Sequence, residues 1–279
     1  MRKILQWLVP FMLACSMNVF ATVNDSSTKV AWSYKGNNGP SRWGQLYPGF
    51  RLCAEGRDQS PINIKMKKNV KPVHSVLKMH YVPGNMDLNN DVSLKLDLGA
   101  IQYIINNGHA IQLNMHGDNK NEWVTFAGKI YKLMQFHFHS PSENQLNSIS
   151  YPMEIHFVHQ GEDGKVLVVG VFVKGGKDNV ALEKIISELP KETGKEFAIN
   201  GGYINPYDLV PSSQDYYSFR GSLTTPPCTE GLQWVVMATP ITASPAQIMT
   251  MRKAALGENA RPVQPLHHRP ITYSVEKKV

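Results

Sequence analysis

The sequence has no long basic block and no basic segment interleaved with aromatic residues, although its formal net charge is +7. Lysine and arginine are scattered, apart from Lys65-Met66-Lys67-Lys68 and Lys277-Lys278. A nucleic-acid-binding protein usually concentrates its basic residues in one patch or stripe. The scattered charge therefore argues against a nucleic-acid partner and favours an ordinary solvated surface.

Linkers are missing as well. We find no serine- or glycine-rich linker, no low-complexity tract and no internal repeat among the 279 residues. A chain of this length can form one large core or two small ones. In the absence of any boundary signal, we predict one domain over residues 22–279.

A hydrophobic run long enough to cross a membrane is also lacking. Arg2 and Lys3 precede an apolar stretch that contains Pro10, and this stretch is shorter than the roughly 20 residues that a membrane span needs. A basic start, a short apolar core and a small residue at Ala21 are typical of a signal peptide, here residues 1–21. An N-terminal core helix is disfavoured, because nothing amphipathic follows. We therefore predict a periplasmic or secreted protein with no stable membrane span.

Cysteine is scarce, with three in the whole chain. Removing the signal peptide would remove Cys15, leave Cys53 and Cys228, and lower the net charge to +5. Two cysteines in an exported protein predict one disulfide, whereas two buried thiols are the less favoured alternative in an oxidising compartment. The stretch Met12-Leu13-Ala14-Cys15 weakly matches a lipoprotein cleavage site, so lipidation of Cys15 stays open.

Strand patterns dominate the rest of the chain. Residues 92–98 alternate apolar and polar side chains, as a half-buried strand does. Two apolar segments flank Asn106-Asn107-Gly108, whose Asn-Gly step predicts a hairpin turn. Residues 166–173 and 232–238 are almost uniformly apolar, as expected for strands covered on both faces.

Helix patterns are few. Residues 180–189 carry apolar side chains at helical spacing and end at Pro190. Ser244 and Pro245 provide an N-cap and a first-turn proline for a second helix. The patterns together predict a mainly β fold with a few helices in one sheet-centred domain.

The segment QFHFH predicts half of a metal site. In a strand over residues 133–139, Gln135, His137 and His139 project from one face, while the two phenylalanines project from the other. The same alternation in EIHFVH places Glu154 and His156 on one face and His159 on the opposite face. The loop between the segments is long enough for an antiparallel pair, so His156 can join the other two histidines.

Three neutral imidazoles leave the fourth tetrahedral position of zinc to water, as in a catalytic site. Gln135 and Glu154 are placed to accept hydrogen bonds from imidazole N–H groups and so orient the ligands. A histidine pair on one strand is often an ordinary core or surface feature, but two such segments with hydrogen-bonding partners favour a metal.

Several segments in a fixed order carry a family resemblance. These are, in chain order, WSYKGNNGPSRW, QSPINI, NNGHA, QFHFH followed by SPSE, EIHFVH, GSLTTPPCTEG and RPVQPLHHRPI. The chain resembles an α-class carbonic anhydrase across nearly all of residues 22–279. This resemblance implies a large, mostly antiparallel central sheet.

The resemblance implies Zn²⁺ bound by His137, His139 and His156. The expected reaction is reversible hydration of CO2 to bicarbonate and a proton, by attack of zinc-bound hydroxide. Glu143 and Thr224 match the family's carboxylate–hydroxyl pair, which orients that hydroxide, and Thr225 would contact bicarbonate. The apolar CO2 site would be lined by Val158, Val168, Leu223 and Trp234.

Proton export is assigned by the same resemblance. His109 matches the proton shuttle, and histidine suits the task because its unperturbed pKa lies near neutrality. Asn107, Gln112 and Tyr34 match positions that order cavity waters, although the family often has asparagine where this chain has Gln112.

Other features of the family bear on packing. The disulfide between Cys53 and Cys228 would tether the loop that bears Thr224. The family has cis peptides at Ser60-Pro61 and Pro226-Pro227. Asn144 replaces a histidine common in animal members, which puts local packing in question, and His159 is interpreted as a core residue. The remaining histidines are assigned to the surface: His74, His80, His116, His267 and His268.

Two alternative functions of other classes are disfavoured by the sequence. A catalytically silent binding module on the same fold usually lacks one or more zinc histidines, whereas all three are present here with Glu143 and Thr224. A zinc-storage protein would favour flexible histidine-rich tracts, which this chain does not have. Exported bacterial members of the family are often dimers, so the resemblance leaves a homodimer open.

Overall fold

A computed structural model describes residues 30–65, 72–81, 100–117, 122–200 and 202–276. The predicted signal peptide, Cys15 and the predicted strand over residues 92–98 lie outside the described residues. None of the helices that the structure describes is long and apolar enough to cross a bilayer.

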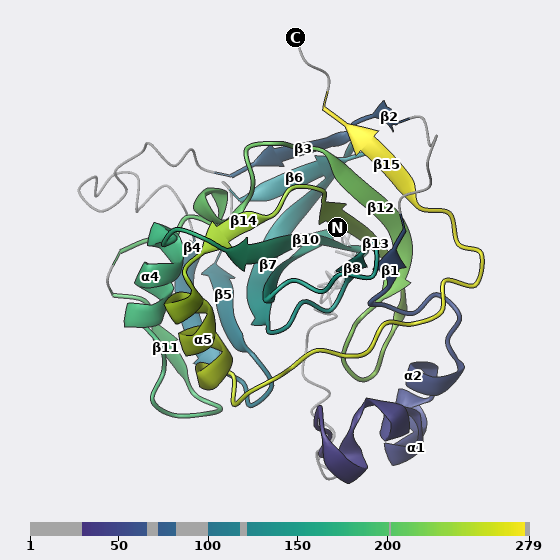
Figure 1. Ribbon diagram of the computed structural model, residues 1–279, viewed down its shortest axis with the longest axis horizontal. Helices are drawn as coiled ribbons and strands as arrows, with labels where there is room; N and C mark the ends of the chain where they lie inside the picture. Colours follow the sequence, from purple (N-terminus) through teal and green to yellow (C-terminus); the bar gives the residue numbers. More distant parts are fainter. Residues whose placement is uncertain (1–29, 66–71, 82–99, 118–121, 201, 277–279) are drawn as a thin grey trace, which may run out of the picture.

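Strands make up most of the regular structure, and one large sheet forms the centre of the molecule (Figure 1). Its thirteen described strands are β2 (Val73–His74), β3 (Leu77–His80), β4 (Ala100–Asn106), β5 (Ile111–Gly117), β6 (Trp123–Phe126), β7 (Lys129–His139), β9 (Met153–Gly161), β10 (Val166–Gly175), β11 (Glu196–Ala198), β12 (Tyr216–Ser222), β13 (Glu230–Met237), β14 (Ile241–Ala243) and β15 (Thr272–Val275). A separate parallel pair joins β1 (Asn63–Ile64) to β8 (Gln145–Leu146).

The main path of the sheet runs β11-β4-β5-β7-β9-β10-β13-β12-β15-β2. Its pairs are antiparallel except for β10 with β13 and β15 with β2, and β14 also joins β10 in parallel. The mainly β fold and the mostly antiparallel sheet are therefore confirmed. The sheet curls so strongly that β10 and β7 lie at the centre of Figure 1, with β4 and β15 toward its margins.

Helices are short and peripheral. Those that the structure describes are α1 (Trp43–Leu46), α2 (Leu52–Glu55), α4 (Val180–Ser187) and α5 (Pro245–Ala254), with 3₁₀ turns η1 (Gly36–Asn38), η2 (Pro40–Arg42), η3 (Pro48–Phe50) and η4 (Pro206–Leu209). Helices α4 and α5 lie side by side at one edge of the sheet (Figure 1). Ser244 caps α5 through a capping box with Gln247, as the Ser-Pro start predicts.

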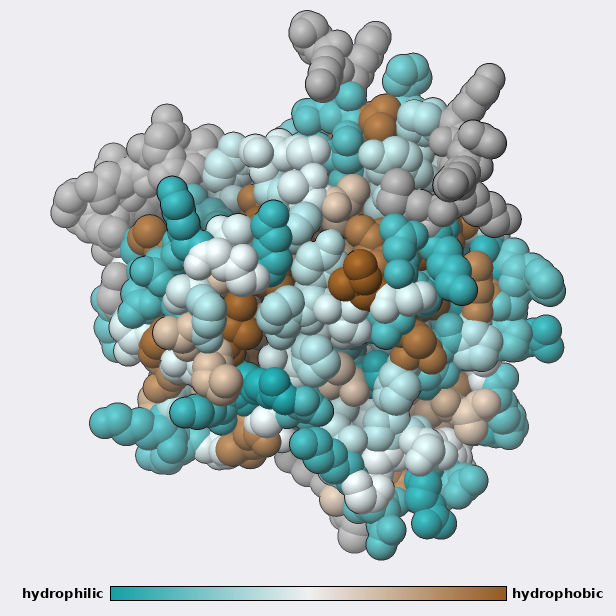
Figure 2. Space-filling model, viewed as in Figure 1, coloured by the Kyte–Doolittle hydropathy of each residue, from teal (hydrophilic) through white to brown (hydrophobic). Residues whose placement is uncertain are grey.

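Hydrophobic side chains divide between the two faces of the sheet. The larger cluster includes Phe136, Phe138 and Phe157, all essentially buried, and each such ring stabilises the fold by roughly 1.5–3 kcal/mol. A second cluster, which includes Val158, Val168 and Trp234, lies on the other face. Figure 2 shows hydrophilic and hydrophobic side chains interspersed over the outer surface in this view.

A bulge in β7 decides which face each residue of the histidine segment meets. The register with β9 shifts between Leu133 and Gln135, so that Leu133 pairs with His159 and Gln135 with Val158. The extra residue, Met134, lines the cavity described below, while Leu133 joins the larger core cluster. Strict alternation over residues 133–139 would have placed Leu133 on the histidine face.

Candidate metal centre

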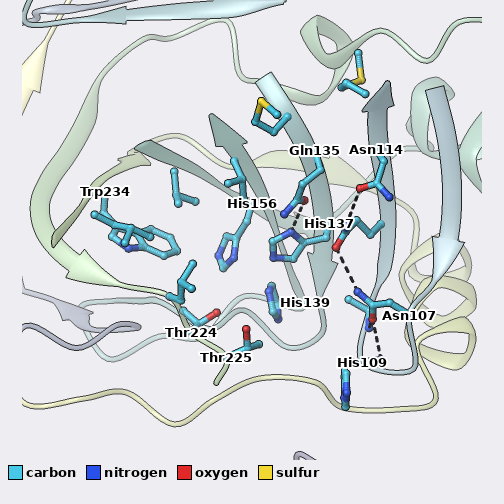
Figure 3. A pocket seen from close by; sticks show the side chains of 18 of the residues that line it. Asn107, His109, Asn114, Gln135, His137, His139, His156, Thr224, Thr225 and Trp234 are labelled. Carbon is cyan, nitrogen blue, oxygen red and sulfur yellow. Dashed lines mark hydrogen bonds between the residues drawn. The ribbon is translucent and has the colours of Figure 1, made fainter. Parts of the chain in front are cut away.

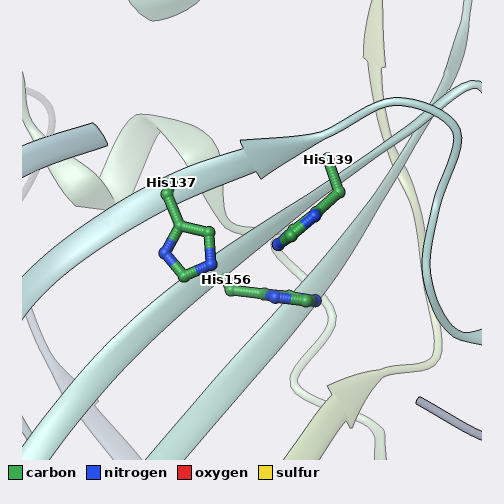
Figure 4. Close-up of side chains that lie close together, drawn as sticks. All are labelled: His137, His139 and His156. Carbon is green, nitrogen blue, oxygen red and sulfur yellow. The ribbon is translucent and has the colours of Figure 1, made fainter. Parts of the chain in front are cut away.

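Three histidines converge on one point of the curled sheet (Figure 4). His137 and His139 come from β7, and His156 lies directly opposite His137 on β9. One nitrogen from each ring lies within 4.8 Å of the others. A side-chain period of two places His137 and His139 on the same face, and the register of β9 supplies the third ring.

Each ring has an acceptor against one of its nitrogens. The contacts are His137 Nδ1 to Gln135 Oε1 at 2.8 Å, His139 Nδ1 to the Asn259 carbonyl at 2.7 Å, and His156 Nε2 to Glu154 Oε1 at 3.1 Å. An acceptor at one nitrogen favours the tautomer that carries its proton there. The other nitrogens, Nε2 of His137 and His139 and Nδ1 of His156, are then left with lone pairs.

The donor set fits a divalent metal such as zinc. Burial lowers the pKa of both His137 and His139, and the neighbouring imidazoles lower that of His137 further. Neutral imidazole is the form that binds metal. His139 Nε2 is buried without a hydrogen-bond partner, which is costly unless the nitrogen has another use. Three histidine nitrogens leave a tetrahedral zinc one open position.

A buried carboxylate holds His156. Glu154 is fully buried, and Asn144 donates to both of its oxygens, through the backbone N–H and the side-chain amide, each at 2.8 Å. Burial alone would raise the pKa of Glu154, but His156 and Asn144 outweigh this effect and lower it. Asn144 also accepts from the Ile62 backbone N–H at 3.0 Å. The Asn144 side chain thus bridges Glu154 and the Ile62 backbone, which immediately precedes β1.

A second buried carboxylate, Glu143, lies behind the ligands. Its Oε2 is 3.5 Å from His139 Nε2 and 3.8 Å from His156 Nδ1, and its Oε1 accepts from the Arg261 backbone N–H at 2.8 Å. Burial raises the pKa of Glu143 to about 7, against the opposing effects of His156, the Arg261 N–H and the Thr224 hydroxyl. Glu143 is therefore adjacent both to the metal-facing nitrogens and to Thr224.

The histidines form the floor of a cavity of about 820 Å³ (Figure 3). One wall is apolar and follows a cross-strand row, in which Val158 pairs with Val168 and Val168 with Trp234. Trp234 is held by its indole N–H, which donates to the Ser222 carbonyl at 3.0 Å. Leu223, Thr224 and Thr225 also line this cavity. A small apolar molecule can thus reach the three histidines.

His109 follows the hairpin turn between β4 and β5 and also lines the cavity. Its backbone N–H donates to Asn107 Oδ1 at 2.9 Å, and its ring stacks on Trp32 with centroids 3.6 Å apart. Burial lowers the pKa of His109. The Asn-Gly turn is confirmed, with Gly108 at φ +85°, where a side chain would be strained.

The predicted disulfide between Cys53 and Cys228 is present. It joins α2 to the loop after β12, which carries Leu223, Thr224 and Thr225. The Cys228 N–H donates to the Thr225 carbonyl at 2.8 Å within the same loop. Peptides at Ser60-Pro61, Ser140-Pro141 and Pro226-Pro227 are cis, so the two expected from the resemblance are found with one more.

Some contacts of the site lie beyond the reach of sequence patterns. Asn259, which orients His139 through its carbonyl, and Arg261, which binds Glu143, come from a segment without regular structure more than 110 residues away. No local periodicity marks them. His116, assigned to the surface, is exposed but lines the cavity and contacts Glu196, so the surface assignment is incomplete. His159 is buried on the opposite face against Tyr81, as predicted.

Comparisons with known proteins all point to one family. Residues 38–275 match the family model for eukaryotic-type carbonic anhydrase. The chain is 40% identical to a carbonic anhydrase of Neisseria gonorrhoeae (85% of this chain, 86% of the relative) and 36% identical to one from a Nostoc species (96% and 95%). A solved structure of the α-carbonic anhydrase of Thermovibrio ammonificans with the inhibitor sulfanilamide superposes with a TM-score of 0.77 at 39% identity, covering 88% of this chain and all of that one.

These matches span nearly all of the described sheet and include the strands that carry the histidines. The agreement of sequence, fold and local geometry assigns the family without recourse to any single motif. The chain therefore belongs to the eukaryotic-type, or α-class, carbonic anhydrases, a family of enzymes that hydrate CO2.

Proposed function

We propose that this chain catalyses the reversible hydration of CO2 to bicarbonate and a proton at a Zn²⁺ ion held by His137, His139 and His156. The observation that carries the proposal is the convergence of three imidazole nitrogens within 4.8 Å at the floor of an open cavity. Bound zinc lowers the pKa of a coordinated water to about 7, a value known from carbonic anhydrases themselves, and so supplies a nucleophile at neutral pH.

Glu143 and Thr224 orient the attacking oxygen. The Glu143 carboxylate is fixed by the Arg261 N–H at 2.8 Å and lies beside Thr224, so it accepts a hydrogen bond from the threonine hydroxyl. The threonine oxygen is then left as an acceptor facing the cavity. A fixed acceptor selects one orientation of the attacking oxygen, so this pair contributes by positioning rather than by acidity.

The apolar wall binds CO2. Carbon dioxide has no net dipole, so a dry surface formed by Val158, Val168 and Trp234 receives it without leaving a buried polar group unpaired. Both valines are nearly buried, with 4% and 3% of their surface exposed, and their small side chains keep the wall open. Leu223 completes this wall and Thr225 contacts the bicarbonate product.

His109 passes the released proton to buffer. Its ring lies at the edge of the cavity, next to Asn107 (Figure 3). The lowered pKa of His109 favours quick release of the proton at neutral pH. Asn107, Gln112 and Tyr34 line the same cavity as this ring and the three histidines, and we assign to their polar atoms the ordering of water between them.

The protein functions outside the cytoplasm under this proposal. A disulfide persists in oxidising compartments, and Cys53 is bonded to Cys228. We propose that residues 1–21 are a signal peptide and that residues 22–279 form the exported catalytic domain.

Stopped-flow CO2 hydration by the purified protein, before and after zinc is removed with a chelator, tests the proposal. We expect activity to disappear with zinc and to return when zinc is added. The His137→Ala variant should resemble the stripped protein, while His74→Ala, at an exposed position on β2, serves as the matched control. A folded, zinc-loaded protein without activity would leave the silent binding module as the better function.

A further inference from the structure

A row of hydrogen-bonded side chains runs along β5, the strand paired with the histidine strand β7. Asn107 Nδ2 donates to Gln112 Oε1 at 3.3 Å, and Gln112 Nε2 donates to Asn114 Oδ1 at 2.6 Å (Figure 3). Gln112 lies opposite His137, and Asn114 lies opposite Gln135, in the register of β5 and β7. The row therefore begins at Asn107, in the hairpin that carries His109, passes the positions opposite His137 and Gln135, and continues along the cavity wall.

The row ends at an imidazole–carboxylate pair. Asn114 Nδ2 donates to Glu196 Oε1, and Glu196 Oε2 lies 3.2 Å from His116 Nε2. All three residues line the same cavity as the metal ligands. The side chains of His116 and Glu196 are 52% and 35% exposed, so buffer molecules in solution can reach them.

Contacts from three strands hold this pair at the cavity rim. His116 projects from β5, Glu196 from the short edge strand β11, and the Tyr103 ring of β4 lies edge-on to the imidazole with centroids 4.7 Å apart. Residue positions 112, 114 and 116 share one face of β5 because side chains alternate. Unlike an isolated surface ion pair, this pair is linked by hydrogen-bonded amides to the strand positions opposite Gln135 and His137.

We propose that the His116–Glu196 pair is a second proton acceptor for the hydration reaction, in parallel with His109. This inference rests on the proposed function. The contact with Glu196 favours the tautomer with the proton on Nε2, so Nδ1 takes a proton from a cavity water. That water in turn receives the proton released by the hydration reaction, and Nδ1 passes its own proton to buffer, which restores the neutral imidazole. Glu196 stabilises the imidazolium formed in between, and the amide side chains order the water that carries the proton.

A second proton acceptor would be useful in this chain because the His109 ring is held in place. The His109 ring stacks flat on Trp32 at 3.6 Å, and its turn is tied down through Asn107. One face of the ring is therefore covered, and its movement between the cavity and solvent is restricted. The His116–Glu196 pair is more exposed than this ring and comes from other elements, the end of β5 and the edge strand β11.

Exchange of ¹⁸O between CO2 and water, followed by mass spectrometry, separates the two steps in one experiment. The CO2–bicarbonate interconversion rate reports the chemistry of the proposed function, and the release rate of labelled water reports proton transfer. The variants are His109→Ala, His116→Ala, the double variant, and His109→Ala combined with Glu196→Gln. His109→Ala combined with His74→Ala is the matched control.

Adding His116→Ala, Glu196→Gln or His74→Ala to His109→Ala should leave the interconversion rate as it is in His109→Ala alone, and His109→Ala should retain measurable release of labelled water. Adding His116→Ala should lower that release by a further factor of about ten or more, in line with the contribution of a general base. Glu196→Gln should lower it several-fold, while the His74→Ala control should not. Imidazole added as buffer should restore release in the double variant.

Equal release of labelled water by His109→Ala and by the double variant, with interconversion intact, would overturn the second acceptor and leave the proposed function standing. Loss of interconversion in the unmodified, zinc-loaded protein would overturn both. Zinc content and circular dichroism of each variant show whether a change reflects proton transfer or a damaged fold.

Discussion

Replacing Gly170 by alanine should weaken zinc binding, because the added methyl group would press on the carboxylate that holds His156. Gly170 lies opposite His156 in the register of β9 and β10. A Cβ at this position would lie 2.9 Å from Glu154 Oε1 and 3.8 Å from His156 Cδ2. Since comfortable contacts between non-bonded atoms begin near 3.5 Å, the carboxylate would have to retreat by roughly half an ångström.

Glu154 has little freedom to make that movement. It is fully buried and accepts two hydrogen bonds of 2.8 Å from Asn144, so a shift disturbs these bonds or its contact with His156 Nε2. Loss of such a partner typically costs 10–100-fold in metal affinity. A partial displacement should lie at the lower end, about tenfold, which corresponds to about 1.4 kcal/mol.

Competition with a chromophoric chelator measures the zinc dissociation constant directly. Gly175→Ala is the matched control, because Gly175 lies on the same strand and a Cβ there would meet nothing within 4 Å. Neither glycine has a positive φ, so alanine strains neither backbone. If Gly170→Ala bound zinc as tightly as the unmodified protein, or if both variants lost affinity equally, the assigned role of Glu154 would be wrong.

Three further predictions concern stability and substrate access. Burial lowers the pKa of His159 to about 3, so between that pH and about 6.5 the unfolded state binds more protons than the folded state. The free energy of unfolding should therefore fall as the pH drops below about 6.5, by roughly 2 kcal/mol at pH 5. Urea titrations at several pH values should show a shallower fall for His159→Gln than for the unmodified protein, and parallel curves would contradict this. Cys228→Ser removes a cross-link between residues separated by 175 positions and should lower the free energy of unfolding, measured in urea, by roughly 5 kcal/mol. A decrease below about 1 kcal/mol would contradict the argument that the disulfide stabilises the protein by restricting the unfolded chain. Val168→Phe should occupy the space beside the apolar wall and lower kcat/KM for CO2 by about 100-fold, with zinc content unchanged. Unimpaired turnover would show that CO2 binds elsewhere.

Sequence patterns predicted the parts of the site that lie within one strand. Alternation places His137 and His139 on one face and their phenylalanine neighbours in the core, and the strands observed in both histidine segments agree with it. The same reasoning placed His159 on the far face, where it is buried against Tyr81. Alternation fails at Met134, because a bulge depends on how β7 must bend against β9 rather than on the local residues.

The sequence alone, then, determined local features of this protein: the strands that carry the histidines, the uniformly apolar strands β10 and β13, the Asn-Gly hairpin, the capped helix and which histidines share a face. Only the tertiary structure decided which residues complete the site. The Asn259 carbonyl reaches His139, the Arg261 N–H reaches Glu143, and His116 meets Glu196 through packing of segments far apart in the chain. Side-chain periodicity is a property of neighbouring residues along one strand, whereas these contacts depend on strand order and loop path, which no local pattern encodes.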